Sequence, residues 1–457
     1  MSTPTPAPYA PQVITLSNGI TLINVYTPDT TTVTVQLVVR AGSRDEVPAT
    51  AGLAHFEEHM LFNGTKKTPD PDEIVDRLSS GGGFTNAFTS EELVSYFAIG
   101  PEQDLELIAD TLCDMVSNPL NDKEHMDRER GAVLEELGNR QQDTFTWCFD
   151  TLQQVAFGGK QSMSWSAIGF EDNVKSVTPK EMNEYHDRFY DPRQTALIVC
   201  GSRVLDKDTA EKLLQSYPKG KRGARTPAKW GQGKLFIGKS LPVPAGQRPV
   251  VDALVALPGI PFNDPDTIAA HVLTMLLSGG NSARLEVLHR KNPKLAHEMF
   301  VYNRQYSDTG QFILGVRADL PQAEKAIGEI VKELDKLART PVSREELKRI
   351  TTLASADLLG STEHTNDLAE FYATRWGNEE PICSPSELAA EYEKITSRDI
   401  QRIAARLMTG LKDARLTFVH QVDPASGKNA LGRTLDEEGT ALLHAATSLV
   451  ERDKGLL

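Results

Sequence analysis

The sequence lacks any run of about 20 apolar residues, the length that a helix needs to cross a lipid bilayer, so no membrane partner is expected. It has only four cysteines, scattered and without a C-x-x-C pair, which argues against a disulfide framework and against a cysteine-bound metal. The N-terminal stretch MSTPTPAP has neither the basic and apolar segments of a signal peptide nor the arginine of a mitochondrial transit peptide. These absences favour a cytoplasmic location.

The composition is that of an ordinary soluble chain with an excess of negative charge. The 457 residues suit two domains of roughly 200 residues each. The formal net charge of −14 mildly favours basic peptide substrates, and the absence of a nucleic-acid-binding motif argues against a nucleic-acid partner. The one basic stretch, Pro218–Lys234, is rich in Lys, Arg, Gly and Pro, which is typical of an exposed linker.

Two imidazoles and a carboxylate stand one helical turn apart in the segment His55-Phe56-Glu57-Glu58-His59. On an α-helix, residues i, i+3 and i+4 share one face, so His55, Glu58 and His59 point into one small volume. The flanking residues are apolar, which predicts a largely buried helix in which these polar groups need a partner. Two histidines at this spacing can hold Zn²⁺, and the glutamate can act as a general base on water, as in metallopeptidases.

A catalytic zinc site takes three protein ligands and leaves one position for water, so one more ligand is needed. A carboxylate is expected, because the cysteines do not cluster. The predicted helix Glu124–Gln141 carries Glu129 and Glu136, which return to nearly the same face after two turns, about 20° out of phase. Glu135 points elsewhere and is expected to be a solvated neighbour.

With these motifs the chain resembles the pitrilysin-type inverzincins, the zinc metallopeptidase family of mitochondrial processing peptidase and insulin-degrading enzyme. In that family a glutamate ligand follows the H-x-x-E-H motif after about 76 residues, and 76 residues separate His59 from Glu136. A second family glutamate, seven residues before the ligand, is matched by Glu129. The resemblance implies these roles: His55, His59 and Glu136 as zinc ligands, Glu58 as the general base, and Glu129 as a residue that orients a ligand imidazole.

The segment Gly82–Thr89 (GGFTNAFT) resembles the G-G-x-x-N-A-x-T strand of the same family. In that family the substrate lies beside the edge of a sheet as an added strand, a binding mode called β-augmentation. The resemblance implies that Phe84, Asn86 and Ala87 bind the peptide substrate.

The chain is expected to contain two related units of the α+β class. In each unit a strand and a loop lead into a helix, Thr32–Val38 before His55 and Asp252–Leu257 before His271. The family fold implied by the resemblance is a mostly antiparallel sheet flanked by helices, once per half. The expected divisions are a zinc-bearing catalytic domain at 1–222, a linker at 223–234, a degenerate repeat domain at 235–423 and a C-terminal helical tail at 424–457.

The second half keeps the predicted scaffold and loses the chemistry. The alignment that places His271 opposite His55 puts residues without metal-binding carboxylates or imidazoles at the other four positions: Thr274, Met275, Thr351 and Leu358. One metal site per chain is therefore expected, in the first half. The tail contains a further candidate helix, Leu435–Val450, which is either a docked helix or a frayed end.

In the family an arginine and a tyrosine, seven residues apart, stabilise the developing oxyanion from the far wall of a closed chamber. The stretch Leu288–His297 matches that region, with Arg290 at the arginine position and His297 in place of the tyrosine. A histidine can donate a hydrogen bond, but its geometry and pKa differ from those of a phenol.

Single-length members of the family build the chamber from two subunits. The resemblance therefore implies either a homodimer that uses Arg290 and His297 in trans, or a heterodimer with a zinc-less paralogue that carries an intact Arg/Tyr pair. The replaced tyrosine slightly favours the heterodimer. The predicted function is a zinc-dependent endopeptidase for unfolded peptides. The alternatives are a non-catalytic core subunit of the same fold, which would have eroded ligands, and a maturation protease with one substrate.

Overall fold

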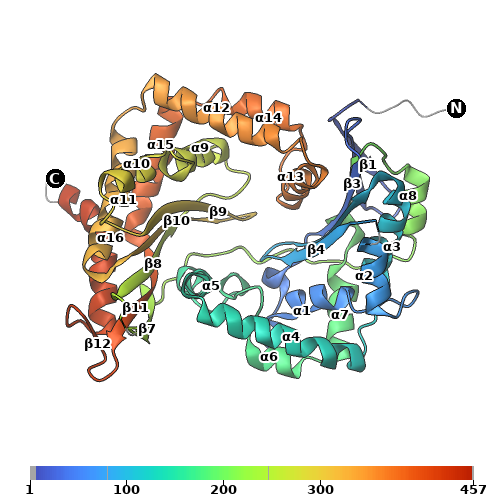
Figure 1. The fold of residues 1–457 in the computed structure, drawn as a ribbon, viewed down its shortest axis with the longest axis horizontal. Coiled ribbons are helices and arrows are strands. Elements are labelled where there is room, and N and C mark those ends of the chain that lie inside the picture. The colour runs from blue at the N-terminus through green and yellow to red at the C-terminus, as the bar shows by residue number, and fades with distance from the viewer. Residues whose placement is uncertain (1–6, 80, 245, 455–457) are drawn as a thin grey trace. The chain divides into compact units, whose positions relative to one another are not determined.

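The computed structural model describes residues 7–79, 81–244 and 246–454, with side chains as far as residue 448 (Figure 1). The chain forms two compact units, and each is assembled from three separate segments. The first unit comprises residues 1–139, 165–226 and 357–388, and the second comprises residues 140–164, 227–356 and 389–457.

The first unit contains a six-stranded sheet in the order β1-β2-β6-β3-β5-β4. β2 and β6 run parallel, and every other neighbouring pair in this sheet is antiparallel. The last strand in the order, β4, is therefore an edge strand. The bounds are β1 (Pro11–Thr15), β2 (Thr21–Tyr26), β3 (Thr32–Val39), β4 (Phe84–Thr89), β5 (Val94–Pro101) and β6 (Thr195–Gly201).

The central strands of this sheet are buried at almost every position, because both of their faces are covered. Because side chains alternate along a strand, Leu22 and Leu37 belong to one core and Ile23 and Val38 to another. The second of these cores is completed by α13 (Thr365–Gly377). The other helices are α1 (Leu53–Leu61), α2 (Pro71–Ser79), α3 (Leu105–Ser117), α4 (Lys123–Gln142), α6 (Glu171–Ser176), α7 (Pro179–Phe189) and α8 (Lys207–Leu213).

The sheet of the second unit has the order β12-β11-β8-β10-β9, with β7 paired to β11 in parallel. Its strands are β7 (Phe236–Pro242), β8 (Val250–Pro258), β9 (Glu298–Gln305), β10 (Gly310–Asp319), β11 (Arg415–Asp423) and β12 (Lys428–Asn429). Two helices, α12 (Arg344–Gly360) and α14 (Pro385–Tyr392), each contain a boundary between the units. The helices that lie wholly in the second unit are α5 (Thr144–Phe157), α9 (Thr267–Ser278), α10 (Arg284–Lys291), α11 (Ala323–Arg339), α15 (Ser397–Gly410) and α16 (Leu435–Lys454).

The two units repeat one topology. The path β2-β6-β3-β5-β4 of the first sheet corresponds to β7-β11-β8-β10-β9 of the second, with the parallel pair at the same place. The helix before the last long strand of each unit even begins with the same capping box, Thr178 with Glu181 in α7 and Thr396 with Asp399 in α15. The predicted α+β fold, with two related sheets flanked by helices, is confirmed.

The expected domain boundaries differ from the compact units in two places. Residues 140–164 were expected in the first domain, but α5 packs on β8 and β11 of the second sheet. Residues 357–388 were expected in the second domain, but α13 packs on β3 and β6 of the first sheet. Each sheet needs cover on its second face, and each takes it from a helix that lies distant along the chain.

The segment expected to be a linker contains no helix or strand, in agreement with its composition. It is nevertheless held to the first unit up to its boundary at residue 226. The guanidinium of Arg225 lies 2.7 Å from a carboxylate oxygen of Asp45, and Arg222 lies 3.3 Å from the other. These two ion pairs anchor the chain before it enters the second unit.

The C-terminal tail is a docked helix over the side chains that the structure describes. α16 packs on α11 and β7, and Leu442 and Ala446 are fully buried there. Glu438 is buried as well and accepts a hydrogen bond from Asn429 at 2.8 Å. The end of the predicted tail, residues 455–457, lies outside the described residues.

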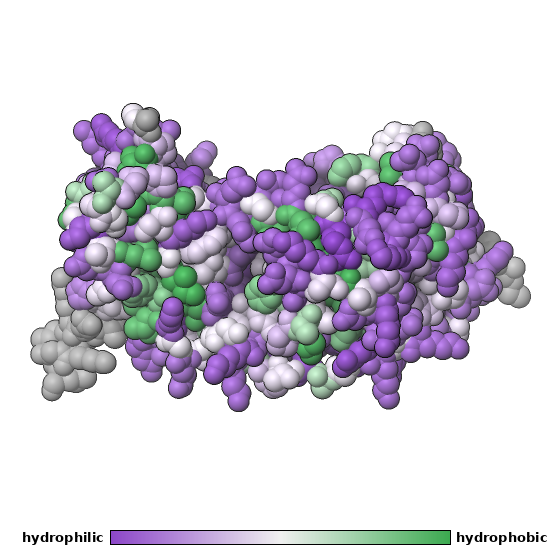
Figure 2. Space-filling model, turned by 90° about the horizontal axis from the view of Figure 1, so that it is seen from below, coloured by the Kyte–Doolittle hydropathy of each residue, from purple (hydrophilic) through white to green (hydrophobic). Residues whose placement is uncertain are grey.

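Across residues 7–79, 81–244 and 246–454, no helix combines the length and the apolar character that crossing a membrane requires. Figure 2 shows one face on which hydrophilic side chains predominate and hydrophobic ones form separate small patches.

Candidate metal centre

The helix that carries the H-x-x-E-H motif is fixed at its first turn. Its N-cap Gly52 has a φ of 104°, a conformation that glycine adopts without strain. A Cβ atom there would lie only 2.7 Å from the carbonyl oxygen of Ile168, so the backbones are in close contact. The carboxylate of Glu46 accepts hydrogen bonds from the N–H groups of Gly52 (3.0 Å) and Ala54 (2.7 Å), which satisfies two free donors at the helix start.

The two histidines of α1 lie on one face, as their spacing predicts. Their ring centroids are 4.7 Å apart. His55 and Glu58 are each 9% exposed, and His59 is partly buried. A mostly buried helix therefore presents two imidazoles and one carboxylate together.

α4 adds two carboxylates to this face. Its buried side chains Met126 and Val133 define the stripe that packs on the unit, and Glu129 and Glu136 lie along the same stripe. One Glu136 oxygen is 3.5 Å from His55 Nε2 and 3.4 Å from His59 Nε2. Of the two glutamates that the sequence offered as a third ligand, Glu136 is the one that joins both imidazoles.

Glu129 contacts the far side of one imidazole. Its carboxylate lies 2.8 Å from His59 Nδ1, and Asn63 donates to its other oxygen, also at 2.8 Å. A histidine whose Nδ1–H is held by a carboxylate presents Nε2 to a metal with a fixed ring orientation. Glu129 therefore lies where the expected orienting role requires it, and the role itself stays a prediction. Asn63 was not singled out from the sequence, although its place four residues after His59 puts it on the same helix face.

The arrangement fits a zinc ion. One ligand atom from each of His55, His59 and Glu136 can be chosen so that all lie within 4.8 Å of one another, and this is the one such group among the described residues. Two atoms bound to one tetrahedral zinc at about 2.0–2.1 Å are about 3.3 Å apart, close to the two distances from Glu136. Two neutral imidazoles and a carboxylate are also a donor set that catalytic zinc uses.

The surroundings of Glu58 and His59 raise the pKa of both side chains, but for different reasons. Burial is the main cause that raises the pKa of Glu58 above its ordinary value, although a hydrogen bond from Thr89 and the nearby His59 oppose it. For His59, burial alone lowers the pKa, but the contacts with Glu129 and Glu136 outweigh it and raise the pKa to about 9.

The edge strand β4 reaches the cluster at its last residue. Thr89 Oγ1 donates a hydrogen bond to Glu58, a contact that the sequence did not predict for this residue. Along β4 the side chains alternate in exposure, so that Phe84 and Asn86 are exposed while Ala87 is half buried. The predicted substrate-binding residues therefore lie on a strand whose outer edge is unpaired in the described sheet and whose end touches the candidate base.

Comparison with known proteins gives the family. Residues 21–164 match the family described as Insulinase (Peptidase family M16), and residues 176–353 match the Peptidase M16 inactive domain. The chain belongs to the M16 peptidase family. The resemblance inferred from the spaced motifs is thereby confirmed.

Several known proteins are similar to this chain over most of its length. An uncharacterized zinc protease of Streptomyces coelicolor is 27% identical over 408 residues, which are 85% of each chain. The mitochondrial-processing peptidase subunit beta of Dictyostelium discoideum is 26% identical over 421 residues, covering 88% of this chain and 87% of that one. A protease from Helicobacter pylori has the same fold, with a TM-score of 0.78 at 24% identity over 90% of this chain and 99% of that chain.

The match to the M16 inactive domain includes four of the five second-half positions that align with the site, and Leu358 lies beyond its end at residue 353. His271 hydrogen-bonds to Tyr392 within the second unit, and Thr274 donates to the carbonyl of Ala270 on its own helix at 2.8 Å. Thr351 is buried in α12. The polar groups at these positions are thus satisfied by other side chains and by backbone.

Arg290 and His297 both lie in the second unit and are each engaged there. Arg290 donates to the carbonyl of Asn281 at 2.6 Å and to Glu286 at 3.3 Å. His297 Nε2 lies 2.8 Å from a carboxylate oxygen of Asp319. Both side chains are about half exposed, and their oxyanion-binding role stays a prediction.

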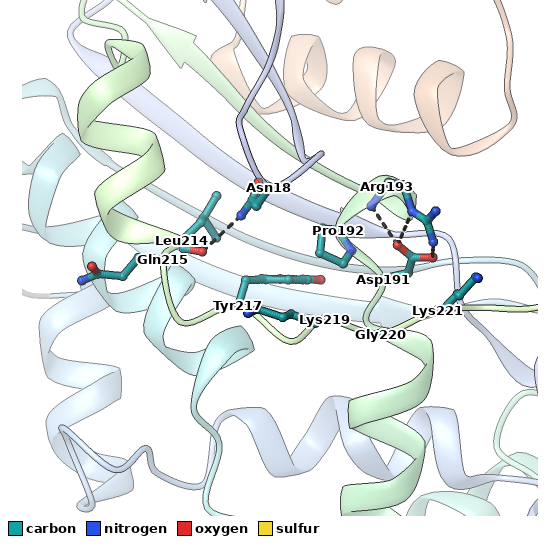
Figure 3. Close-up of a pocket in the computed structure, with 10 residues that line it drawn as sticks. All are labelled: Asn18, Asp191, Pro192, Arg193, Leu214, Gln215, Tyr217, Lys219, Gly220 and Lys221. Carbon is teal, nitrogen blue, oxygen red and sulfur yellow. Dashed lines mark hydrogen bonds and ion pairs between the residues drawn. The ribbon is translucent and has the colours of Figure 1, made fainter.

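The first unit also contains a cavity of about 320 Å³, and the residues that line it differ from those of the metal cluster (Figure 3). Its polar groups are bonded within the protein: Asn18 donates to the carbonyl of Leu214 at 3.2 Å, and Asp191 accepts from Arg193 at 2.9 Å. None of the residues of the cluster lines it. The lining residues are Asn18, Asp191, Pro192, Arg193, Leu214, Gln215, Tyr217, Lys219, Gly220 and Lys221.

Proposed function

We propose that this M16 family member is a zinc-dependent endopeptidase that hydrolyses unfolded peptides. The observation that carries the proposal is the convergence of His55, His59 and Glu136 next to the buried carboxylate of Glu58. A zinc ion held by the first three residues would lower the pKa of a water molecule and polarise the scissile carbonyl. The retained donor set also argues against the alternative of a non-catalytic core subunit, for which eroded ligands are expected.

Glu58 is placed to move the protons of the reaction. As a carboxylate it takes a proton from the attacking water while the new C–O bond forms, and it then delivers that proton to the leaving amine as the C–N bond breaks. A pKa raised by burial suits both steps, because the group must accept and release a proton near neutral pH. The hydrogen bond from Thr89 holds one carboxylate oxygen and so orients the group.

Strand β4 supports an extended peptide as the substrate. Its unpaired edge offers backbone N–H and C=O groups to which a peptide can add as a further strand. The exposed Phe84 and Asn86 flank that edge, which ends at Thr89 beside the base. Only a chain segment free of its own secondary structure can bind in this way, which favours unfolded substrates.

A chamber formed with a second subunit belongs to the same proposal. It is supported by relatives that are named as subunits, including the processing peptidase subunit beta of Dictyostelium discoideum, and by the oxyanion pair that Arg290 and His297 would supply. The partner is either a second copy or a zinc-less paralogue. A purified chain that cleaves peptides robustly by itself would exclude an obligatory different partner.

The decisive experiment joins metal analysis to cleavage mapping. The purified chain should contain about one zinc per chain and cleave a mixed peptide pool, with the cut sites identified by mass spectrometry. A dedicated maturation protease, the remaining alternative, would cut one sequence in the pool and leave the rest intact. An active preparation without metal would contradict the proposal.

A further inference from the structure

We infer that Glu57, the charged residue between the two histidine ligands to which the mechanism gives no role, is a positioning residue for the metal centre. Together with Asn121 and His186 it fixes the placement of α1 against the start of α4. The inference rests on the proposed zinc site, because α1 supplies two of its ligands and α4 supplies the third. It concerns how the ligands are held at the right separation rather than how they bind.

Glu57 points away from the metal face. Successive residues of an α-helix are about 100° apart, so Glu57 lies about 180° from the direction midway between His55 and His59. Its side chain is 0% exposed. The same helix therefore carries a metal-binding face and, on its back, a fully buried carboxylate.

Two side chains from other elements meet this carboxylate. Asn121 Nδ2, in the turn just before α4, lies 3.1 Å and 3.0 Å from the two Glu57 oxygens. His186 Nδ1 of α7 lies 2.8 Å from one of them, at an angle that does not meet hydrogen-bond geometry. Asn183 of α7 also donates to the carbonyl of Asn121 at 3.3 Å, so the three elements form one connected cluster.

The turn that holds Asn121 is itself rigidly joined to α4. The next residue, Asp122, accepts hydrogen bonds from the N–H groups of Glu124 (3.0 Å) and His125 (3.1 Å) in the first turn of that helix. A displacement of Asn121 is therefore a displacement of α4. Glu136 lies about 20 Å further along the same helix and moves with it.

A carboxylate in this place defines one arrangement of the helices. Burying a carboxylate away from water is unfavourable, and only well-placed partners offset that cost. An apolar side chain would tolerate a small slide of α1 along α4, because van der Waals contact has no preferred direction. Glu57 does not tolerate such a slide, because the movement would separate its buried carboxylate from Asn121 and His186. The gain is a fixed separation between His55, His59 and Glu136.

The test measures metal binding rather than turnover. In Glu57→Leu, zinc affinity determined by competition with a chromophoric chelator should fall about 10- to 100-fold, the usual effect of losing a group that holds metal ligands in place. The visible absorption bands of the cobalt-loaded protein should shift, because they report ligand geometry. Asn121→Ala leaves the Glu57–His186 pair intact and should change both readouts in the same direction, so it carries the test if Glu57→Leu does not fold.

A matched control exists in the second unit. Glu438 is also 0% exposed and accepts a hydrogen bond from an asparagine, Asn429, at 2.8 Å. Glu438→Gln should leave zinc affinity and the cobalt spectrum unchanged. In the double variant Glu57→Leu/His186→Phe the unpaired histidine is gone, yet zinc affinity should stay low because the helices are still not held.

Recovery of wild-type affinity in the double variant would overturn the inference, because the effect of Glu57→Leu would then come from an unpaired buried histidine. Folded Glu57→Leu and Asn121→Ala proteins that bind zinc as tightly as the wild type would overturn it as well. These outcomes differ from failure of the proposed function, in which the wild-type chain itself would bind no zinc.

Discussion

Helices α1 and α9 precede matching strands in two sheets of the same topology, but they carry different chemistry. In α1 the polar residues converge with α4 on a common point, whereas in α9 His271 bonds to Tyr392 and Thr274 bonds to its own helix backbone. The second unit keeps an imidazole at only one of these positions and carries none of the carboxylates. The fold therefore does not require the full polar cluster of the first unit.

The largest effect is expected from Glu58→Gln. The amide keeps the size of the side chain but cannot take a proton, so kcat should fall by about 10²- to 10⁴-fold. Zinc content should stay at the wild-type level, because Glu58 is not a ligand in the proposal. Kinetics on a fluorogenic peptide together with metal analysis check this. Unchanged turnover would remove Glu58 from its role.

Glu136→Gln should remove the metal itself. Loss of a charged ligand is expected to weaken zinc binding by more than about 100-fold, beyond the effect of losing a supporting group. His271→Ala is the matched control, since the aligned histidine of the second unit should leave zinc content unchanged. Equal zinc binding by wild type and Glu136→Gln, measured by chelator competition, would refute the ligand assignment.

Glu129→Gln should have an intermediate effect. The amide can still hold the His59 ring but no longer offers it a negative charge, so zinc affinity should fall about 10- to 100-fold. The comparison with Glu136→Gln separates a residue that supports a ligand from the ligand itself. A variant that loses all zinc would show that Glu129 binds the metal directly.

The first turn of α1 should make stability depend on pH. Burial raises the pKa of Glu46 to about 8, although backbone hydrogen bonds from Ala54 and Gly52 oppose it. Between its ordinary pKa and about 8, the folded chain keeps a proton that the unfolded chain has lost. The free energy of unfolding should therefore decrease as pH rises through this range, by up to about 1.4 kcal/mol per pH unit.

Glu46→Gln should flatten that slope, as urea unfolding at about pH 5 and about pH 8 would show. The corresponding helix α9 begins beside Asp266, which Arg402 contacts at 3.0 Å through its guanidinium. The two helix starts are therefore held by different means. A slope that is the same in wild type and Glu46→Gln would contradict the prediction.

The smallest effects test whether the two units are equivalent. Thr178→Ala and Thr396→Ala each remove one half of a capping box in corresponding helices. Each should lower the free energy of unfolding by about 1 kcal/mol. Two unfolding curves are enough to compare them. A clear difference between the two would show that the repeats no longer share the energetics of this cap.

The metal cluster could be predicted from the sequence because its geometry is mostly local. Helical spacing brings His55, Glu58 and His59 together, and spacing of seven residues returns Glu129 and Glu136 to one face. Only the meeting of α1 with α4 needed tertiary information, and the resemblance to a known family supplied it. The helix and strand positions were similarly accessible, as the predicted helix Glu124–Gln141 and the observed α4 show.

The contacts that support the cluster could not be predicted in this way. In the sequence nothing distinguishes Glu57 from other charged residues, and only the structure shows Asn121 and His186 beside it. For a related reason, the sequence did not predict on which of the two sheets α5 and α13 pack. An apolar stripe shows that a helix is packed on something, but the identity of that surface depends on chain segments hundreds of residues away.

The packing of α13 on the first sheet has a consequence for the expression of truncated fragments. A fragment that stops after residue 222 would contain the whole motif and both carboxylates of α4, yet it would lack the helix that covers Ile23, Val38 and Ile198. The apolar sheet face that α13 covers would then be exposed to water, and the fragment should aggregate rather than hydrolyse peptides. The first unit is complete only at residue 388, which is 388 − 222 = 166 residues further along the chain.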